Sequence, residues 1–200
     1  MREIIPGVLT WPCFSEKHGY DFNGHLVLHE GGNLAIDPVE PGPGVLEALA
    51  ARGVAQIVLT NRNHFRAAEA LRQRTGARVL VHEEDAAFVR GKGVEVGGSL
   101  VHGARVGPFW VLDASGKSPG EVALHWPERR LLLVGDACVG KSPGALALLP
   151  AAVIDDLPRL HRSLSRLAAL DLETLLVGDG HSILTGAGAA LRALAASLPS

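Results

Sequence analysis

Apolar runs of strand length alternate with helical patterns along this chain, and the alternation occurs twice. Each half starts with a strand-rich stretch and continues with strands and helices in turn, which predicts an α/β (α+β) fold built from two similar halves. The expected helices cover residues 44–52, 64–74, 83–90, 155–170 and 187–197. The expected strands cover residues 4–10, 24–29, 33–36, 55–59, 78–81, 99–102, 109–112, 121–126, 131–134, 146–149 and 174–177.

The pentapeptide L-L-V-G-D supports this arrangement, because it occurs at residues 132–136 and again at residues 175–179. Each copy is an apolar strand that ends in Gly-Asp, so Asp136 and Asp179 are expected at the carboxyl ends of strands. Open sheets usually bind their ligands at those ends. Because the Pro- and Gly-rich stretches of the chain are typical of loops and not of domain linkers, we expect one domain over residues 1–200.

A strand-to-helix corner is expected where the strand A-Q-I-V-L runs into T-N-R-N-H-F-R at residues 60–66. Many enzymes place metal ligands or nucleophiles at such a corner. Here the polar side chains are those of Asn61, Asn63, His64 and Arg66, and of these only His64 is a usual zinc ligand. The position is that of a functional site, but most of its residues cannot perform metal chemistry.

Composition argues against several classes of protein. Hydrophobic residues make up 47% of the chain, charged residues 20%, and the net charge is -2, which favours neither a nucleic-acid nor a membrane partner. The first nine residues, M-R-E-I-I-P-G-V-L, contain an acid and a proline where a signal peptide is apolar, so we expect a cytoplasmic protein. Cys13 and Cys138 lack C-x-x-C spacing and indicate neither a zinc site nor a disulfide framework.

Five landmarks in order along most of the chain resemble the motifs of the metallo-β-lactamase superfamily. An early strand pair ends in Asp37, and the family motif T-H-x-H-x-D-H falls on residues 60–66. The motif G-H-[ST]-P-G is similar to G-K-S-P-G at residues 116–120, a strand ending in Gly-Asp is met by Asp136, and P-G-H-G is similar to D-G-H-S with His181. The resemblance implies a four-layer αβ/βα sandwich whose loops hold one or two metal ions for hydrolysis.

Carried over one by one, the metal positions of the family fall on Asn61, Asn63, Phe65, Arg66, Lys117, Asp136 and His181. Only Asp136 and His181 keep a residue that the family uses as a ligand. The amide oxygen of asparagine is a poor zinc ligand, and a phenylalanine offers none. The two cations would each repel a metal at ~4 Å by several kcal/mol at an effective dielectric constant near 20. The sequence therefore predicts that the dinuclear zinc site is lost and that no cofactor is bound.

Loss of the metal would leave Asp136 without a cation, and a buried unpaired carboxylate is costly. We expect an ion pair between Lys117 and Asp136, with Asn61 and Asn63 hydrogen-bonding in the same pocket. The chain would then keep the fold of metal-dependent hydrolases and bind a small anionic ligand through Arg66, Lys117 and the two asparagines.

A second interpretation keeps catalysis. Two histidines and one carboxylate are a recognised metal set, so Asp136, His181 and His64 could hold one zinc, iron or manganese ion in a mononuclear hydrolase. Asp136 and His181 could also perform acid–base hydrolysis without a metal. Against this, His64 lies at a variable position of the family motif, where a side chain is expected to face away from the ligands. His181 could equally be a loop histidine bonded to Asp179, Asp136 or the backbone.

A minor alternative is nucleotide binding, because G-D-A-C-V-G-K-S at residues 135–142 fits the P-loop pattern G-x-x-x-x-G-K-[ST]. A P-loop needs its Lys and Ser to open a helix, so that backbone N–H groups face the phosphates. Here Pro-Gly follows at once, and then an apolar segment typical of a strand. The pattern alone therefore gives little support to a nucleotide site.

The expected partners are a small-molecule ligand or substrate and a second copy of the chain. The segment 187–197 is rich in Ala and Leu, and such a helix could pack against a second subunit in a homodimer.

Overall fold

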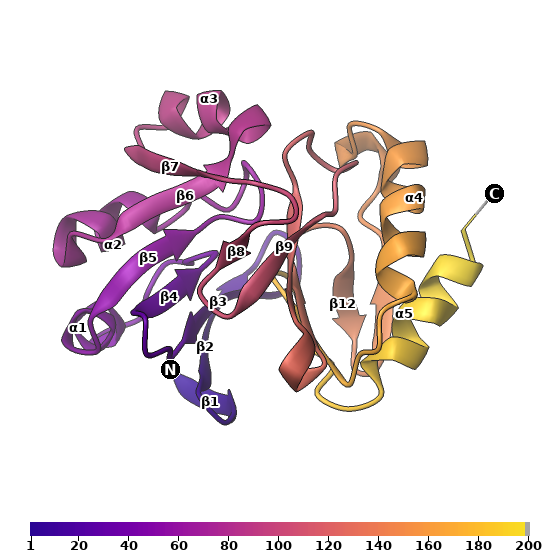
Figure 1. The fold of residues 1–200 in the computed structure, drawn as a ribbon, viewed down its shortest axis with the longest axis horizontal. Coiled ribbons are helices and arrows are strands. Elements are labelled where there is room, and N and C mark those ends of the chain that lie inside the picture. The colour runs from indigo at the N-terminus through magenta and orange to yellow at the C-terminus, as the bar shows by residue number, and fades with distance from the viewer. Residues whose placement is uncertain (199–200) are drawn as a thin grey trace.

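The computed structural model, which describes residues 1–198, consists of two main sheets packed face to face with helices on their outer sides (Figure 1). Seven strands follow one another in chain order in the first sheet. They are β1 (Arg2–Ile5), β2 (Val8–Ser15), β3 (Tyr20–Val27), β4 (Asn33–Ile36), β5 (Val54–Val58), β6 (Arg78–His82) and β7 (Val96–Leu100). Three helices pack on the outer face of this sheet: α1 (Val45–Ala51), α2 (Ala68–Thr75) and α3 (Glu83–Gly91).

The second sheet has five strands in the order β14-β11-β10-β9-β8. They are β8 (Arg105–Val106), β9 (Phe109–Asp113), β10 (Val122–Trp126), β11 (Leu131–Val134) and β14 (Thr174–Val177). Helices α4 (Leu157–Ala168) and α5 (Ala187–Ala196) cover its outer face, and β12 (Val139–Ser142) pairs with β13 (Ala145–Ala147) in a small separate ribbon. Two short 3₁₀ helices, Pro127–Arg129 and Ala151–Val153, complete the structure.

Strand β11 shows how one apolar sequence fills two cores. Because successive side chains of a strand point to opposite faces, Leu131 and Leu133 pack between the two sheets, while Leu132 and Val134 pack against α4 and α5. The leucines of α4 are spaced to meet that outer face, and Leu160, Leu164 and Leu167 are buried there. The predicted four-layer αβ/βα sandwich is therefore confirmed.

The first expected strand, residues 4–10, is two strands in the structure. Pro6 and Gly7 form a turn between β1 and β2, with Gly7 at φ 76°, a left-handed conformation that glycine adopts without strain. The carboxylate of Glu3 accepts a hydrogen bond from the N–H of Gly7 at 2.6 Å. The sequence is apolar on both sides of this turn, and residues 4–10 were therefore predicted as one strand.

The helix expected to begin at His64 begins at Ala68. Residues 61–67 form a series of turns instead, and the N–H of His64 bonds to the carbonyl of Asn61 at 3.3 Å. His64 is fully buried within these turns. The turns of this corner therefore direct side chains toward the second sheet. A helix over the same residues would instead have placed them on the surface of the helix.

The P-loop-like stretch does not open a helix. Lys141 and Ser142 lie on strand β12, which pairs with β13. The N–H of Gly140 bonds to the carbonyl of Asp179 at 3.0 Å, and the carbonyl of Gly140 accepts from His181 at 2.7 Å. A Cβ on Gly140 would lie 2.0 Å from the carbonyl oxygen of His181, so glycine is required here by packing and not by phosphate binding.

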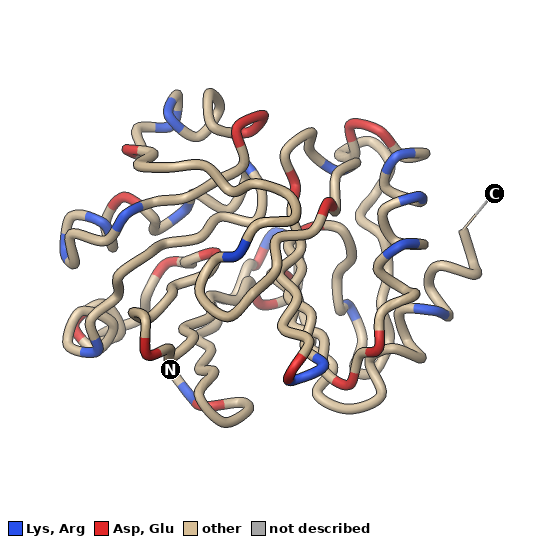
Figure 2. Tube along the Cα trace, viewed as in Figure 1, with Lys and Arg blue, Asp and Glu red and all other residues tan. Residues whose placement is uncertain are grey.

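Acidic and basic residues are interspersed over both halves of the molecule (Figure 2), in keeping with 19 Lys and Arg against 21 Asp and Glu. Arg159, Arg162 and Arg166 follow one another along α4, at positions other than those of its buried leucines. Within residues 1–198, none of the helices combines the length and the apolar character that crossing a membrane requires.

Candidate functional site

Polar side chains from both sheets converge where four strands end. Asp37 follows β4 and Thr60 follows β5, which are parallel neighbours in the first sheet. Asp136 follows β11 and Asp179 follows β14, which are parallel neighbours in the second. The carboxyl ends of parallel strands meet at one edge of a sheet, so the two copies of L-L-V-G-D deliver their carboxylates to the same place.

Asp37 anchors the site on the first sheet. Its carboxylate accepts hydrogen bonds from the N–H of Thr60 at 2.8 Å and from the Thr60 hydroxyl at 2.6 Å. The same carboxylate forms an ion pair with Nδ1 of His64 at 2.8 Å. Asp37 has a φ of 48°, which is uncommon for a residue other than glycine, and these three contacts hold it there.

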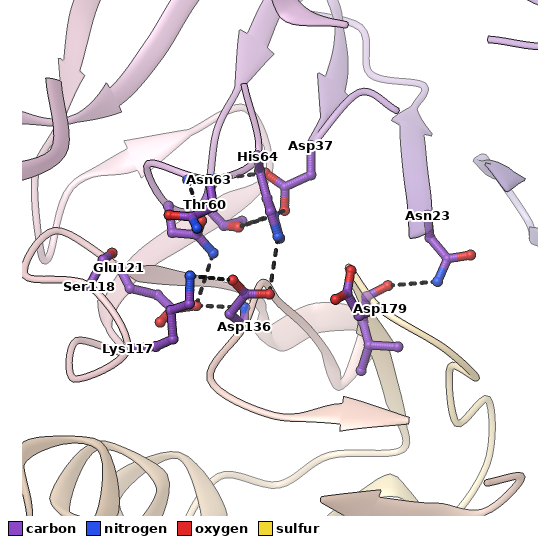
Figure 3. Close-up of polar contacts among 12 residues, drawn as sticks. Asn23, Asp37, Thr60, Asn63, His64, Lys117, Ser118, Glu121, Asp136 and Asp179 are labelled. Atoms are coloured by element: carbon purple, nitrogen blue, oxygen red, sulfur yellow. Dashed lines mark hydrogen bonds and ion pairs between the residues drawn. The ribbon is translucent and has the colours of Figure 1, made fainter. Parts of the chain in front are cut away.

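His64 joins the two sheets. Its Nε2 lies 3.2 Å from Oδ1 of Asp136, so the ring bridges Asp37 and Asp136 (Figure 3). Burial alone would lower the pKa of His64, but the carboxylates of Asp37 and Asp136 outweigh burial and raise it to about 10. The ring is then an imidazolium that donates from both nitrogens. The position of His64 in the family motif had favoured a side chain that faces away from the ligands, and that part of the expectation was wrong. Its grouping with Asp136, which the second interpretation from the sequence required, is what the structure shows.

Lys117 forms the ion pair with Asp136 that the sequence predicted. Its Nζ lies 2.8 Å from Oδ2 of Asp136, and the lysine side chain is 5% exposed. Burial alone would raise the pKa of Asp136, but His64 and Lys117 hold it below its usual range. Each carboxylate oxygen of Asp136 thus faces a cationic nitrogen of the protein.

Glu121 is hydrogen-bonded to the backbone of Asp136. Its Oε1 accepts a hydrogen bond from the N–H of Asp136 at 2.6 Å and another from the side-chain amide of Asn61 at 3.3 Å. The other end of that amide, Oδ1 of Asn61, accepts from the N–H of Asn63 at 2.8 Å. Burial, together with the charge of Asp136, raises the pKa of Glu121 to about 8, so this acid is mostly neutral at pH 7.

Asp85, in the first turn of α3, fixes the loop that carries Lys117. Its carboxylate accepts hydrogen bonds from the hydroxyl of Ser118 at 2.6 Å and the N–H of Gly120 at 3.2 Å. It also accepts from the N–H of Arg62 at 2.9 Å. One buried carboxylate therefore ties the strand-to-helix corner to the G-K-S-P-G loop and sets where the ammonium group of Lys117 lies.

A cavity of about 780 Å³ opens above these contacts. Five of the expected site residues line it: Asn63, Arg66, Lys117, Asp136 and Asp179. The rest of the wall consists of basic or aromatic side chains and of small or apolar residues. The former are Lys17, His18, Tyr20, Phe22 and Lys141, and the latter are Gly19, Leu149, Pro150 and Val153. The cavity is thus rich in positive charge, and its two acids lie at its inner end, where they are nearly fully buried.

His181 lies elsewhere. It is exposed and lines a separate cavity of about 150 Å³, together with Asp21, Asn23 and Ser182. Within residues 1–198, the acidic residue of this loop that approaches Asp136 is Asp179, because the N–H of Gly180 bonds to the carbonyl of Asp21 at 2.7 Å and turns the next residue outward. The expected meeting of His181 with Asp136 is therefore replaced by a meeting of Asp179 with Asp136.

His64, Asp136 and Asp179 form a candidate metal group. One ligand atom from each lies within 4.8 Å of the others, and all three residues are buried. A set of one imidazole and two carboxylates is chemically suited to zinc, iron or manganese. The expectation that no cofactor is bound is consequently not supported. The metal set considered from the sequence was Asp136, His64 and His181, and in the structure Asp179 takes the place of His181.

Two residues that position the site were not assigned a role from the sequence. Asp85 belongs to a run of acids that is typical of the start of a helix. This local explanation gave no reason to expect its contacts with two distant loops, at Arg62 and at Ser118. Glu121 directly follows G-K-S-P-G and precedes β10. An acid between a polar loop and a strand that starts with three apolar residues was the signal that could have identified it.

Comparison with known proteins agrees with the fold. The sequence profile of the metallo-beta-lactamase superfamily matches residues 2–198. A hydroxyacylglutathione hydrolase of Cereibacter sphaeroides is 32% identical over 183 residues, which cover 87% of this chain and 66% of that protein. The chain thus spans slightly less than two thirds of the length of this relative.

Solved structures give the same result. TTHA1623, solved in a di-iron-bound form, superimposes with a TM-score of 0.66 at 26% identity over 86% of this chain and 93% of that one. A metallo-beta-lactamase from Pontibacter korlensis superimposes with a TM-score of 0.78 at 18% identity over 98% of each chain, which supports the fold. This chain therefore belongs to the metallo-β-lactamase superfamily, a family of hydrolases.

Proposed function

We propose that this superfamily member has exchanged its metal centre for cations of the protein and binds a small organic anion in the cavity of about 780 Å³. The observation that supports the proposal best is the pairing of Lys117 with Asp136 at 2.8 Å. Lys117 lies at the position where the family motif G-H-[ST]-P-G has a histidine. A fixed positive charge therefore takes the place of a neutral metal ligand.

The contacts of His64 argue against a metal ion in this group. An imidazole must offer an unprotonated nitrogen to a metal. Both ring nitrogens of His64 face carboxylates, Asp37 at 2.8 Å and Asp136 at 3.2 Å, and this favours the doubly protonated ring. The three residue types suit a metal ion, but in this arrangement both nitrogens of His64 are engaged by carboxylates and neither is offered to a metal.

The charges of the site balance without a metal. Asp37 and Asp136 contribute two carboxylates, and His64 and Lys117 contribute two cations in direct contact with them. Adding a divalent ion would place it beside Lys117, and charges of the same sign ~4 Å apart repel by several kcal/mol at an effective dielectric constant near 20. A metal would therefore have to displace Lys117 and deprotonate His64.

The nature of the ligand follows from the wall of the cavity. Lys17 and Lys141 are exposed there, Arg66 and Lys117 lie deeper, and such a concentration of cations attracts an anion. The relatives named as hydroxyacylglutathione hydrolases suggest the class, since an acylglutathione is a small organic anion with two carboxylates. We propose ligands of this kind, bound in a site that has no hydrolytic metal.

The second candidate function is that of a mononuclear hydrolase. It is favoured by the approach of ligand atoms of His64, Asp136 and Asp179 to within 4.8 Å. In that case the three side chains would hold one zinc, iron or manganese ion, which would activate water for hydrolysis. The two candidates make opposite predictions about Lys117 and about bound metal.

Replacing Lys117 by Met should lower the free energy of unfolding by roughly 3 to 5 kcal/mol, because it leaves the carboxylate of Asp136 buried without that partner. Chemical denaturation monitored by tryptophan fluorescence measures the change. Adding Asp136→Asn to the variant should recover part of the loss, because it removes the unpaired charge.

Lys141→Met is the matched control, since Lys141 lies in a second G-K-S-P-G pentapeptide but is exposed. Its effect should stay within about 0.5 kcal/mol. Equal stability of the Lys117 and Lys141 variants would contradict the assignment of Lys117 as the replacement for a metal.

Protein purified without chelator should contain well under one equivalent of zinc, iron or manganese by elemental analysis. Its thermal midpoint should also stay constant when each metal is added, because an ion that does not bind the folded state cannot stabilise it. One equivalent of metal that is lost in Asp179→Ala but kept in Asp171→Ala, an exposed acid on the surface, would instead establish the mononuclear site.

A hydroxyacylglutathione should bind to the protein in calorimetric titration, and Lys141→Glu should weaken its binding by roughly tenfold or more at low salt. The reason is that the variant places a negative charge on the wall of the cavity. Lys92→Glu, on the exposed end of α3 and outside that wall, is the control and should bind like the unchanged protein. Equal affinity of the two variants, or no binding to the unchanged protein, would count against the anion site.

A further inference from the structure

Two buried polar atoms at the inner end of the cavity lack a hydrogen-bond partner within residues 1–198. They are Oδ1 of Asp179 and Nη1 of Arg66. Both residues line the cavity of about 780 Å³, and Asp179 is only 4% exposed. A buried polar group without a partner costs about 1 to 3 kcal/mol, so the pair calls for a ligand that satisfies both atoms.

Asp179 and Arg66 do not satisfy each other. Nη2 of Arg66 lies 3.9 Å from Oδ1 of Asp179, which is within reach of an ion pair but too long for a hydrogen bond. One atom offers an acceptor and the other a donor, side by side. The two groups are therefore complementary to a ligand that carries a donor and an acceptor at neighbouring positions.

Neighbouring residues hold Arg66 and the loop of Asp179 in this arrangement. The guanidinium group of Arg66 lies 3.8 Å from the centre of the Phe22 ring, a cation–π contact that fixes its plane. The side-chain amide of Asn23 bonds to the carbonyls of Val177 and Gly180, at 3.2 and 2.8 Å, and so fixes the loop that carries Asp179. Figure 3 shows Asn23 beside Asp179. Groups fixed before binding lose less entropy when a ligand arrives.

We propose that Asp179 and Arg66 bind the ammonium and the carboxylate of an α-amino acid group in the ligand. The ammonium would donate to Oδ1 of Asp179, and the carboxylate would accept from Nη1 of Arg66. This inference rests on the proposed anion site and specifies one end of its ligand. It also accounts for an acid in a basic cavity, because Asp179 repels anions that lack an adjacent ammonium group.

The α-amino acid group could belong to a free amino acid or to one end of a larger conjugate, such as the γ-glutamyl end of a glutathione derivative. The chemistry recognised by Asp179 and Arg66 is the same in both cases. The exposed Lys17 and Lys141, elsewhere on the cavity wall, would add affinity only for a ligand that extends toward them.

Calorimetric titration of the unchanged protein with three probes tests the inference. The probes are glutathione, its analogue in which hydrogen replaces the α-ammonium group, and free glutamate. We expect glutathione to bind at least about tenfold more tightly than the analogue, since the analogue leaves Asp179 unpaired. Binding of glutamate as tight as that of glutathione would identify a free amino acid as the ligand, and weaker binding would identify a conjugate.

Asp179→Asn should abolish the preference for glutathione over the analogue, whereas Asp171→Asn, at an exposed acid, should keep it. The comparison of ligands on the unchanged protein needs no variant to fold. Equal affinity for glutathione and the analogue would overturn this inference and leave the anion site standing. If neither these probes nor a hydroxyacylglutathione binds, the anion site itself is refuted, and this inference with it.

Discussion

The carboxylate of Asp136, held between the ammonium group of Lys117 and the imidazole of His64, is the contact on which the rest of the site depends. It joins three separate parts of the chain: the corner after β5, the loop before β10 and the end of β11. In a buried position such a carboxylate must have a cation. In this superfamily member the two cationic groups in contact with it, the Lys117 ammonium and the His64 imidazole, belong to the protein.

The surrounding residues serve to place those cations. Asp37 holds one side of His64 while Thr60 restrains Asp37, and Asp85 ties down the loop that carries Lys117. Glu121 accepts from the backbone of Asp136, and its own raised pKa of about 8 keeps a further negative charge out of the cluster at pH 7. Arg66 and Asp179 line the cavity next to this cluster, and each has a buried polar atom without a hydrogen-bond partner within residues 1–198.

Much of this could be predicted from the sequence, because it depends on local patterns. The alternation of strand and helix patterns predicted an α/β fold of two halves, and the resemblance to the superfamily predicted the four-layer sandwich. The two Gly-Asp ends predicted that Asp136 and Asp179 follow strands. The resemblance to the superfamily placed Lys117 and Asp136 in one site, and charge balance then predicted their pairing.

The site features that could not be predicted depend on the path of the backbone over a few residues. His64 turns inward because residues 61–67 form turns and the helix starts only at Ala68. Asp179 occupies the position expected for His181 because a single turn at Gly180 decides which of the two faces Asp136. The hydrophobic periodicity of the sequence predicts neither the inward direction of the His64 side chain nor the turn at Gly180.

The central claim is that Lys117 and His64 hold Asp136 in place of a metal. Crystals grown with zinc and measured at the zinc absorption edge test it most directly. We expect no anomalous peak among His64, Asp136 and Asp179, and electron density for the ammonium group of Lys117 within hydrogen-bonding distance of Asp136. A strong peak among those three side chains, with Lys117 turned away from Asp136, would contradict the claim.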